Sequence, residues 1–234
     1  MKFLSTFFAL SLLSASAIAA GTSPPPDLDL TIRYYSKVLT PEGVTREAHY
    51  EEKMLRRPGH VWVARSLPKT AVEQQVTKKN VVLKIQEPEH SHFNHVVLPR
   101  HVMLENAKFR VEYVDAHARN IVTIPASEYD NVNFDGSWEN NFYLIDPKLV
   151  KAMPLSPKAS NVPGAEWHER EKNGVFQRVL WDAQKQIPLI IESGDKAAMF
   201  YQRVDVTPQA SVSLALPWKN LQGFAQKEYA DFLD

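Results

Sequence analysis

The sequence of 234 residues contains no cysteine. Disulfide bonds, thiolate nucleophiles, zinc ribbons, thiol-ligated clusters and covalently attached haem are therefore excluded together. An excess of either charge is also missing, because 27 basic side chains are matched by 27 acidic ones. The lysines and arginines are scattered, and the densest basic group, Lys53, Arg56 and Arg57, is expected at a solvated strand end. This pattern argues against nucleic acid or an anionic membrane surface as a partner.

Signatures of catalysis are missing as well. The chain has no Gly-x-Ser-x-Gly elbow, no glycine-rich phosphate loop and no dinucleotide fingerprint. Residues 168–172 (HEREK) begin like the helix of a zinc protease, but Lys172 stands where the second histidine is required, and the run falls in a predicted strand. The sequence therefore predicts a non-enzymatic protein. A hydrolase whose site is assembled from distant residues remains an alternative.

The N-terminus has the pattern of an export signal. Residues 1–20 contain one lysine, an apolar run and then small residues with cleavage triplets that end at Ala17 and Ala19. The apolar run is too short to span a bilayer, and no second run follows it, so no transmembrane segment is expected after signal cleavage. Residues 21–27 (GTSPPPD) form a proline-rich leader, and residues 28–234 are expected to form a single domain. We predict a periplasmic protein if the source is Gram-negative.

Residues 175–206 predict an antiparallel meander of three strands, because three apolar runs are separated by turn residues at 182–186 and 193–195. Apolar side chains fall on both sides of these strands, as Val179 and Leu180 do in the first one. A sheet with two apolar faces has to be covered on each face by a helix, by a second sheet or by a bound apolar ligand. The meander therefore raises the question of what covers the two faces of the sheet.

Elsewhere the alternation of apolar and polar residues predicts a mainly β (α+β) fold with a few helices. A short helix is expected at residues 148–153, and an amphipathic helix at the C-terminus, beginning at Pro217 and covering one side of the sheet. The apolar stripe of this terminal helix comprises Leu221, Phe224, Ala225, Phe232 and Leu233. Further strands are expected at residues 28–39, 44–55, 60–67, 81–85, 108–114, 120–125 and 165–172.

Two segments resemble metal sites. Four histidines, His90, His92, His95 and His101, lie close together, with Met103 nearby. Imidazole with a thioether suits copper, and imidazole alone suits zinc, so a site for Cu or Zn is one hypothesis and a solvent-facing loop is the other. Residues 131–136 (NVNFDG) copy part of a calcium loop but lack its final glutamate. A turn in which Asn and Asp bind their own backbone is expected there instead.

Short motifs in the meander resemble the ligand-sheet hairpin of periplasmic lipoprotein-carrier proteins: residues 178–182 (RVLWD), 186–192 (QIPLIIE) and 201–204 (YQRV). The hairpin at residues 34–50, with Gly43 at its turn, is similar to the related sensor domains that detect mislocalised lipoproteins. This resemblance implies a curved, antiparallel, open half-barrel whose hollow side is plugged by helices and admits lipid chains. In the carriers an amphipathic helix directly follows the signal, whereas here a strand is expected.

The predicted function follows from the two apolar faces and from this resemblance. We expect an exported protein that binds a hydrophobic small molecule, a lipid or a lipidated protein in the hollow of the half-barrel. Some of the many aromatic side chains on the strands would line this cavity instead of filling the core. A periplasmic metal-binding protein that uses the four histidines is the alternative.

Overall fold

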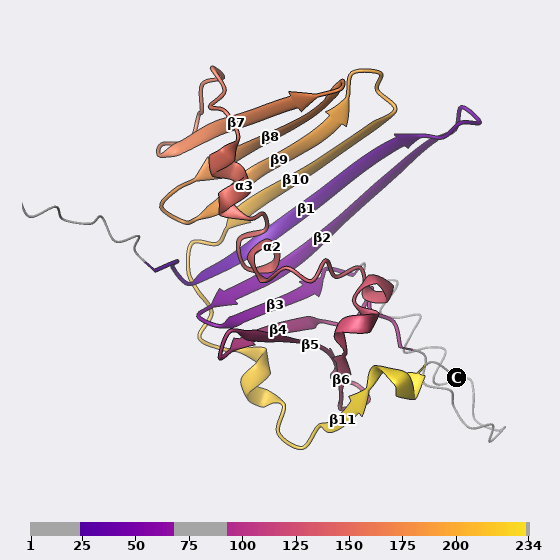
Figure 1. Cartoon of the computed structure of the whole chain (residues 1–234). Helices are drawn as coiled ribbons and strands as arrows, with labels where there is room; N and C mark the ends of the chain where they lie inside the picture. Colours follow the sequence, from indigo (N-terminus) through magenta and orange to yellow (C-terminus); the bar gives the residue numbers. More distant parts are fainter. Residues whose placement is uncertain (1–23, 68–92, 233–234) are drawn as a thin grey trace, which may run out of the picture.

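The computed structural model describes residues 24–67 and 93–232 (Figure 1). The predictions for the signal peptide at residues 1–20, for a strand at residues 81–85 and for His90 and His92 fall outside the described residues. Within them, no helix combines the length and the apolar character needed to cross a membrane.

Eleven strands of the described chain form one sheet in the order β11-β6-β5-β4-β3-β2-β1-β10-β9-β8-β7. Neighbouring strands are antiparallel, apart from β11, which runs parallel to β6. The two outermost strands do not pair with each other, so the sheet stays open and the predicted mainly β, open antiparallel architecture is confirmed. The strands are β1 (Leu28–Leu39), β2 (Thr45–Arg57), β3 (His60–Arg65), β4 (Arg100–Glu105), β5 (Lys108–Asp115), β6 (Asn120–Ile124), β7 (Ala165–Lys172), β8 (Val175–Asp182), β9 (Ile187–Asp195), β10 (Phe200–Pro208) and β11 (Ala225–Glu228).

The topology requires a long crossover between β6 and β7, and a second one, residues 209–224, between β10 and β11. The chain starts in the middle of the sheet with β1, proceeds outward through β2 to β6, and then passes to the opposite edge at β7 before it returns through β10 to β1. A connection between opposite edges of an open sheet has to run over one face. Figure 1 shows this crossover, residues 125–164, in front of the strands. We call the face that it covers the crossover face and the other face the outer face.

The central strands carry the core on their crossover face. Because side chains alternate between the faces of a strand, Leu30 and Ile32 of β1 lie on the same side as Met54 of β2 and Val63 of β3. The first three are at most 2% exposed. They join one apolar cluster that also includes Phe142 from the crossover. Burial of this stripe, at ~25 cal/mol per Å² of apolar surface, explains why the strands adopt this register.

The crossover is held by short helices with capped ends. It contains two 3-10 turns, η1 (Ala126–Glu128) and η2 (Asp130–Val132), and two α-helices, α2 (Trp138–Tyr143) and α3 (Pro147–Ala152). The Ser137 side chain accepts the amide hydrogen of Asn140 and caps α2, and Asp146 caps α3 in the same way. The helix predicted at residues 148–153 is confirmed as α3.

The amphipathic helix predicted from Pro217 is wrong. The chain forms instead a 3-10 turn, η3 (Pro217–Asn220), then β11, and then another 3-10 turn, η4 (Tyr229–Phe232). Leu221 and Phe224 pack with Trp62 on the outer face, whereas Tyr229 and Phe232 pack against the core of the crossover face. The expected helical stripe is therefore divided between two faces, because β11 carries the chain along the edge strand β6.

Two of the three basic residues at the end of β2 are buried, contrary to the prediction, whereas Lys53 is exposed. Arg56 is 0% exposed and Arg57 is 7% exposed. Arg57 forms an ion pair with Asp29 at 2.7 Å and donates to the main-chain oxygen of Ser213. Both arginines thus tie distant segments to the sheet, because a buried guanidinium needs acceptors for its hydrogen atoms.

Candidate functional site

A hollow remains between the sheet and the crossover. Its larger lobe has a volume of about 520 Å³ and reaches across strands β1, β3 and β9 to the crossover. Apolar side chains from the sheet, including Ile32, Val63 and Ile191, face Leu144 and Leu149 across it. The lobe falls within the ~300–1,000 Å³ of small-molecule sites. The inner wall of the sheet is therefore not completely filled by the side chains of the crossover.

The larger lobe, predicted as a cavity for a hydrophobic guest, is also partly polar. Ser193 lies between Gln177 and Gln202 in the register of β8, β9 and β10, and all three side chains line the lobe. On the crossover, Asp135 and Asn140 face the same space and are hydrogen-bonded to each other at 2.6 Å. An amphipathic guest fits this lining better than a purely apolar one.

A smaller lobe of about 360 Å³ adjoins the first and shares four lining residues with it: Tyr34, Glu52, Arg100 and Asn133. Arg65, His95 and Tyr113 also line this lobe. Burial raises the pKa of Tyr34 well above its ordinary value, and the nearby Glu52 carboxylate raises it further. The smaller lobe thus joins tyrosine, arginine and carboxylate groups at one end of the hollow.

The Asn and Asp residues that resemble a calcium loop form turn structure at the mouth of this hollow. The Asp135 carboxylate accepts the amide hydrogen of Ser137 at 3.0 Å, and Asn133 adopts a left-handed conformation with φ of 52°. The predicted binding of nearby backbone is therefore confirmed for Asp135, whereas the Asn131 and Asn133 side chains contact the side chains of Glu128 and His95. Asn133 lines both lobes of the hollow.

The structure does not bring together the two histidines of the predicted metal site that it describes. His95 lines the smaller lobe on the crossover face, where its Nε2 lies 3.2 Å from the Asn133 amide nitrogen. His101 lies on the outer face, opposite Trp62. Among residues 24–67 and 93–232, no group of three or more His, Asp or Glu side chains has the arrangement of a metal site. Metal binding that also involves His90 and His92 remains a prediction.

His101 instead contacts His60, a residue that sequence reasoning placed only in a strand. His60 Nδ1 lies 3.1 Å from His101 Nε2, and the Trp218 ring stacks on both imidazoles with 5.2 Å between ring centroids. Burial, followed by the influence of His60 and Arg110, lowers the pKa of His101 to about 4. Burial also lowers the pKa of His60. This pair is therefore neutral at pH 7 and holds the C-terminal segment on the outer face.

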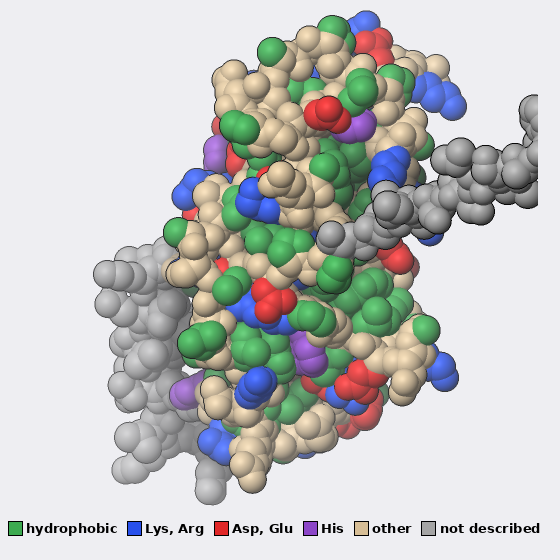
Figure 2. All heavy atoms as spheres, turned by 90° about the vertical axis from the view of Figure 1, so that its left-hand side faces the viewer, with side chains coloured by type: hydrophobic (Ala, Val, Ile, Leu, Met, Phe, Trp, Pro, Cys, Tyr) green, Lys and Arg blue, Asp and Glu red, His purple; other side chains and the backbone are tan. Residues whose placement is uncertain are grey.

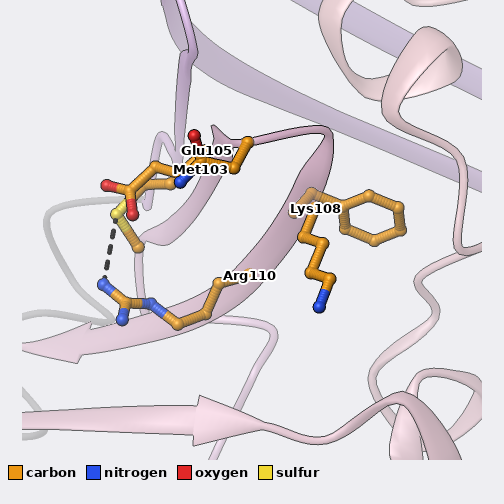
Figure 3. A pocket seen from close by; sticks show the side chains of 6 residues that line it. Met103, Glu105, Lys108 and Arg110 are labelled. Carbon is orange, nitrogen blue, oxygen red and sulfur yellow. Dashed lines mark hydrogen bonds between the residues drawn. The ribbon is translucent and has the colours of Figure 1, made fainter.

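A second depression of about 340 Å³ lies beside the β4–β5 hairpin (Figure 3). Figure 3 shows Met103 and Glu105 of β4 opposite Arg110 of β5, with Lys108 at the side. The Arg110 guanidinium donates to the Met103 sulfur at 3.7 Å. Because Glu105, Lys108 and Arg110 are exposed, the walls of this depression are the solvated ends of long side chains. The hollow under the crossover is the larger of the two sites, and its walls come from the sheet and the crossover together.

The side of the molecule at the left of Figure 1 contrasts with the hollow. Figure 2 views the side of the molecule on the left of Figure 1, and there hydrophobic side chains form small patches separated by charged side chains and histidines. Small scattered patches are normal for a monomeric protein surface. The hollow, and not a broad apolar patch on this face, is therefore the candidate functional site.

The hydrolase alternative also depends on where histidines lie. In the described part of the chain, His60, His95, His101 and His168 hydrogen-bond to a histidine, an asparagine or a main-chain oxygen, and not to a serine or threonine hydroxyl. In a serine hydrolase a histidine base is hydrogen-bonded to the hydroxyl nucleophile, and none of these four histidines makes such a hydrogen bond. An unrecognised hydrolase site remains a prediction.

No protein-family model matches this sequence, and no curated protein matches it. Among solved structures, the chain is similar to PNGF-II, with a TM-score of 0.33, 9% identity and coverage of 88% of this chain. It spans only 32% of the length of PNGF-II. A domain from Vibrio parahaemolyticus, named for outer membrane lipoprotein sorting, is similar with a TM-score of 0.30, 10% identity and coverage of 80% of this chain and 87% of that domain.

A DUF1329 family protein from Desulfovibrio piger is similar to the same degree, with a TM-score of 0.30, 7% identity and coverage of 80% of this chain and 88% of that protein. At TM-scores near 0.3, we infer neither ligand nor activity from any of the three.

Proposed function

We propose that this chain is an exported, periplasmic, non-enzymatic protein that holds a hydrophobic or amphipathic guest, either a lipid or the lipid group of a partner protein, in the hollow under the crossover. The observation that carries the proposal is the larger lobe, which stays open against the apolar wall of Ile32, Val63 and Ile191. Covering this wall removes apolar surface from water and stabilises a complex by ~25 cal/mol per Å² before the cost of ordering the guest.

The fold favours this use of the hollow. Its wall consists of paired strands, which hold their side chains in fixed positions, whereas its cover is a connection with only two short helices. Elements with few packed contacts open more readily than the core of a sheet. A guest would therefore enter beside the crossover without disturbing the strands.

Uptake of the uncharged dye Nile red tests the proposal. The mature protein should bind the dye with an increase in fluorescence, and Ser193→Trp should weaken binding by about tenfold or more, because an indole at this position projects into the larger lobe. Lys53→Trp is the matched control, because Lys53 is exposed on the outer face of β2 and should leave dye binding unchanged. A wild-type protein that does not bind the dye, or a Ser193→Trp variant that binds it normally, would overturn the proposal.

A further inference from the structure

Two arginines stand together at the polar end of the hollow. Arg65 ends β3 and Arg100 begins β4, which pairs with β3 through Val63 and Arg100. Both line the smaller lobe, and the Nε atom of each is buried without a hydrogen-bond partner. In the described ranges, no carboxylate forms an ion pair with either guanidinium. A buried cationic donor without an acceptor is unfavourable unless a ligand supplies one.

Aromatic rings hold these guanidinium groups in place. The Arg65 guanidinium lies 3.9 Å from the centroid of the Tyr50 ring, and that of Arg100 lies 5.7 Å from the centroid of the Phe134 ring. Such contacts orient a guanidinium, but they leave its positive charge and most of its donors available. The two arginines are therefore positioned before any ligand arrives.

The smaller lobe carries a surplus of positive charge. Among the described residues that line this lobe, Glu52, which is paired with Arg65 across β2 and β3, is the one carboxylate, against two guanidinium groups. Burial lowers the pKa of His95, and the charges of Arg100 and Arg65 lower it further, so this imidazole is neutral at pH 7. The remaining charge of the lobe favours an anion.

We propose that Arg65 and Arg100 bind the anionic head group, a carboxylate or a phosphate, of an amphiphile whose apolar tail lies along Ile32, Val63 and Ile191 in the larger lobe. This inference rests on the proposed function and names the ligand class for the same hollow. The lobes adjoin at Arg100, so one molecule reaches both. The planar guanidinium donates two parallel hydrogen bonds to carboxylate or phosphate, which favours arginine for this role.

Calorimetric titration with palmitate and with hexadecanol, which carries the same tail without the charge, tests the inference. Palmitate should bind the wild-type protein at least about tenfold more tightly, the ratio expected from one charge-assisted hydrogen bond. In the double variant Arg65→Gln, Arg100→Gln this preference should disappear, while the affinity for hexadecanol stays the same. Arg33→Gln is the matched control, because the Arg33 side chain is 64% exposed and lies outside the hollow.

The single variant Arg100→Lys keeps a positive charge and should retain part of the preference for palmitate, so the inference stays testable if the double variant does not fold. Equal binding of palmitate and hexadecanol by the wild-type protein would overturn the head-group inference and leave the proposed function standing. Binding of neither molecule would overturn both. Inorganic phosphate that binds as tightly as palmitate would identify a site for free anions and would overturn the assignment to an amphiphile.

Discussion

Replacing Arg56 with methionine is predicted to destabilise the fold by about 3 kcal/mol. The guanidinium donates to the main-chain oxygens of Pro26, Lys185 and Gln186, so one buried side chain fastens the leader and the β8–β9 turn to β2. Each hydrogen bond from a charged donor contributes ~1.5–3 kcal/mol. Burial opposes this gain and lowers the pKa of Arg56 to about 10. The group is still charged at neutral pH, and the net contribution is smaller than the sum of its bonds.

Methionine keeps an unbranched apolar stem, so the variant isolates the loss of the donors from a loss of packing. Urea unfolding followed by tryptophan fluorescence should show the expected loss, and the melting temperature should fall by roughly 6–12 °C. Lys53→Met, at an exposed position of the same strand, should change the stability by less than about 0.5 kcal/mol. If Arg56→Met unfolds at the same urea concentration as Lys53→Met, the buried arginine does not fasten these segments.

Two other changes should also lower the stability. Because the folded state lowers the pKa of His101 to about 4, the unfolded chain binds the proton more readily, and stability that is complete above about pH 6.5 is lost by about 3 kcal/mol as the pH falls toward 4. His101→Phe should flatten this pH profile of urea unfolding, and a profile parallel to that of the wild type would contradict the buried neutral pair. Gly194→Ala should cost about 2 kcal/mol, since a Cβ atom there would lie 2.9 Å from the Phe176 ring and 3.0 Å from the Phe200 oxygen. Thermal unfolding measures this loss, and a midpoint equal to that of Ser193→Ala would refute the close approach.

The strands that alternate clearly could be predicted from the sequence. In β1 and β2 the alternation of apolar and polar side chains continues over more than three apolar–polar pairs of residues. The three predicted strands of the meander correspond to β8, β9 and β10. Strand β4 was not predicted. His101 and Met103 alternate in it with Val102 and Leu104, and this pair of side chains was interpreted as possible metal ligands instead of as one face of a strand. Only the pairing with β3 shows that His101 packs against Trp62 on the outer face.

The errors at the C-terminus and at Arg56 have a common cause. Apolar residues that recur every three or four positions mark one face of a helix only if a helix forms. Here the chain forms β11 instead, which is hydrogen-bonded to the distant strand β6. The acceptors of Arg56 likewise come from the leader and from the β8–β9 turn. Such partners are set by strand order, which local patterns do not encode. The hollow was expected from the two apolar faces, but its arginines and tyrosines were not, since the pairing of β3 with β4 brings the arginines together and β1, β2 and β5 supply the tyrosines.

Native mass spectrometry of the mature protein, purified from the cells that export it, tests the central claim most directly. The account predicts a second species, heavier than the polypeptide by the mass of one lipid, and predicts that Ser193→Trp reduces this species while Lys53→Trp leaves it unchanged. Protein that carries only the mass of its polypeptide, and that still takes up no lipid when mixed with it, would contradict the claim that the hollow holds a guest.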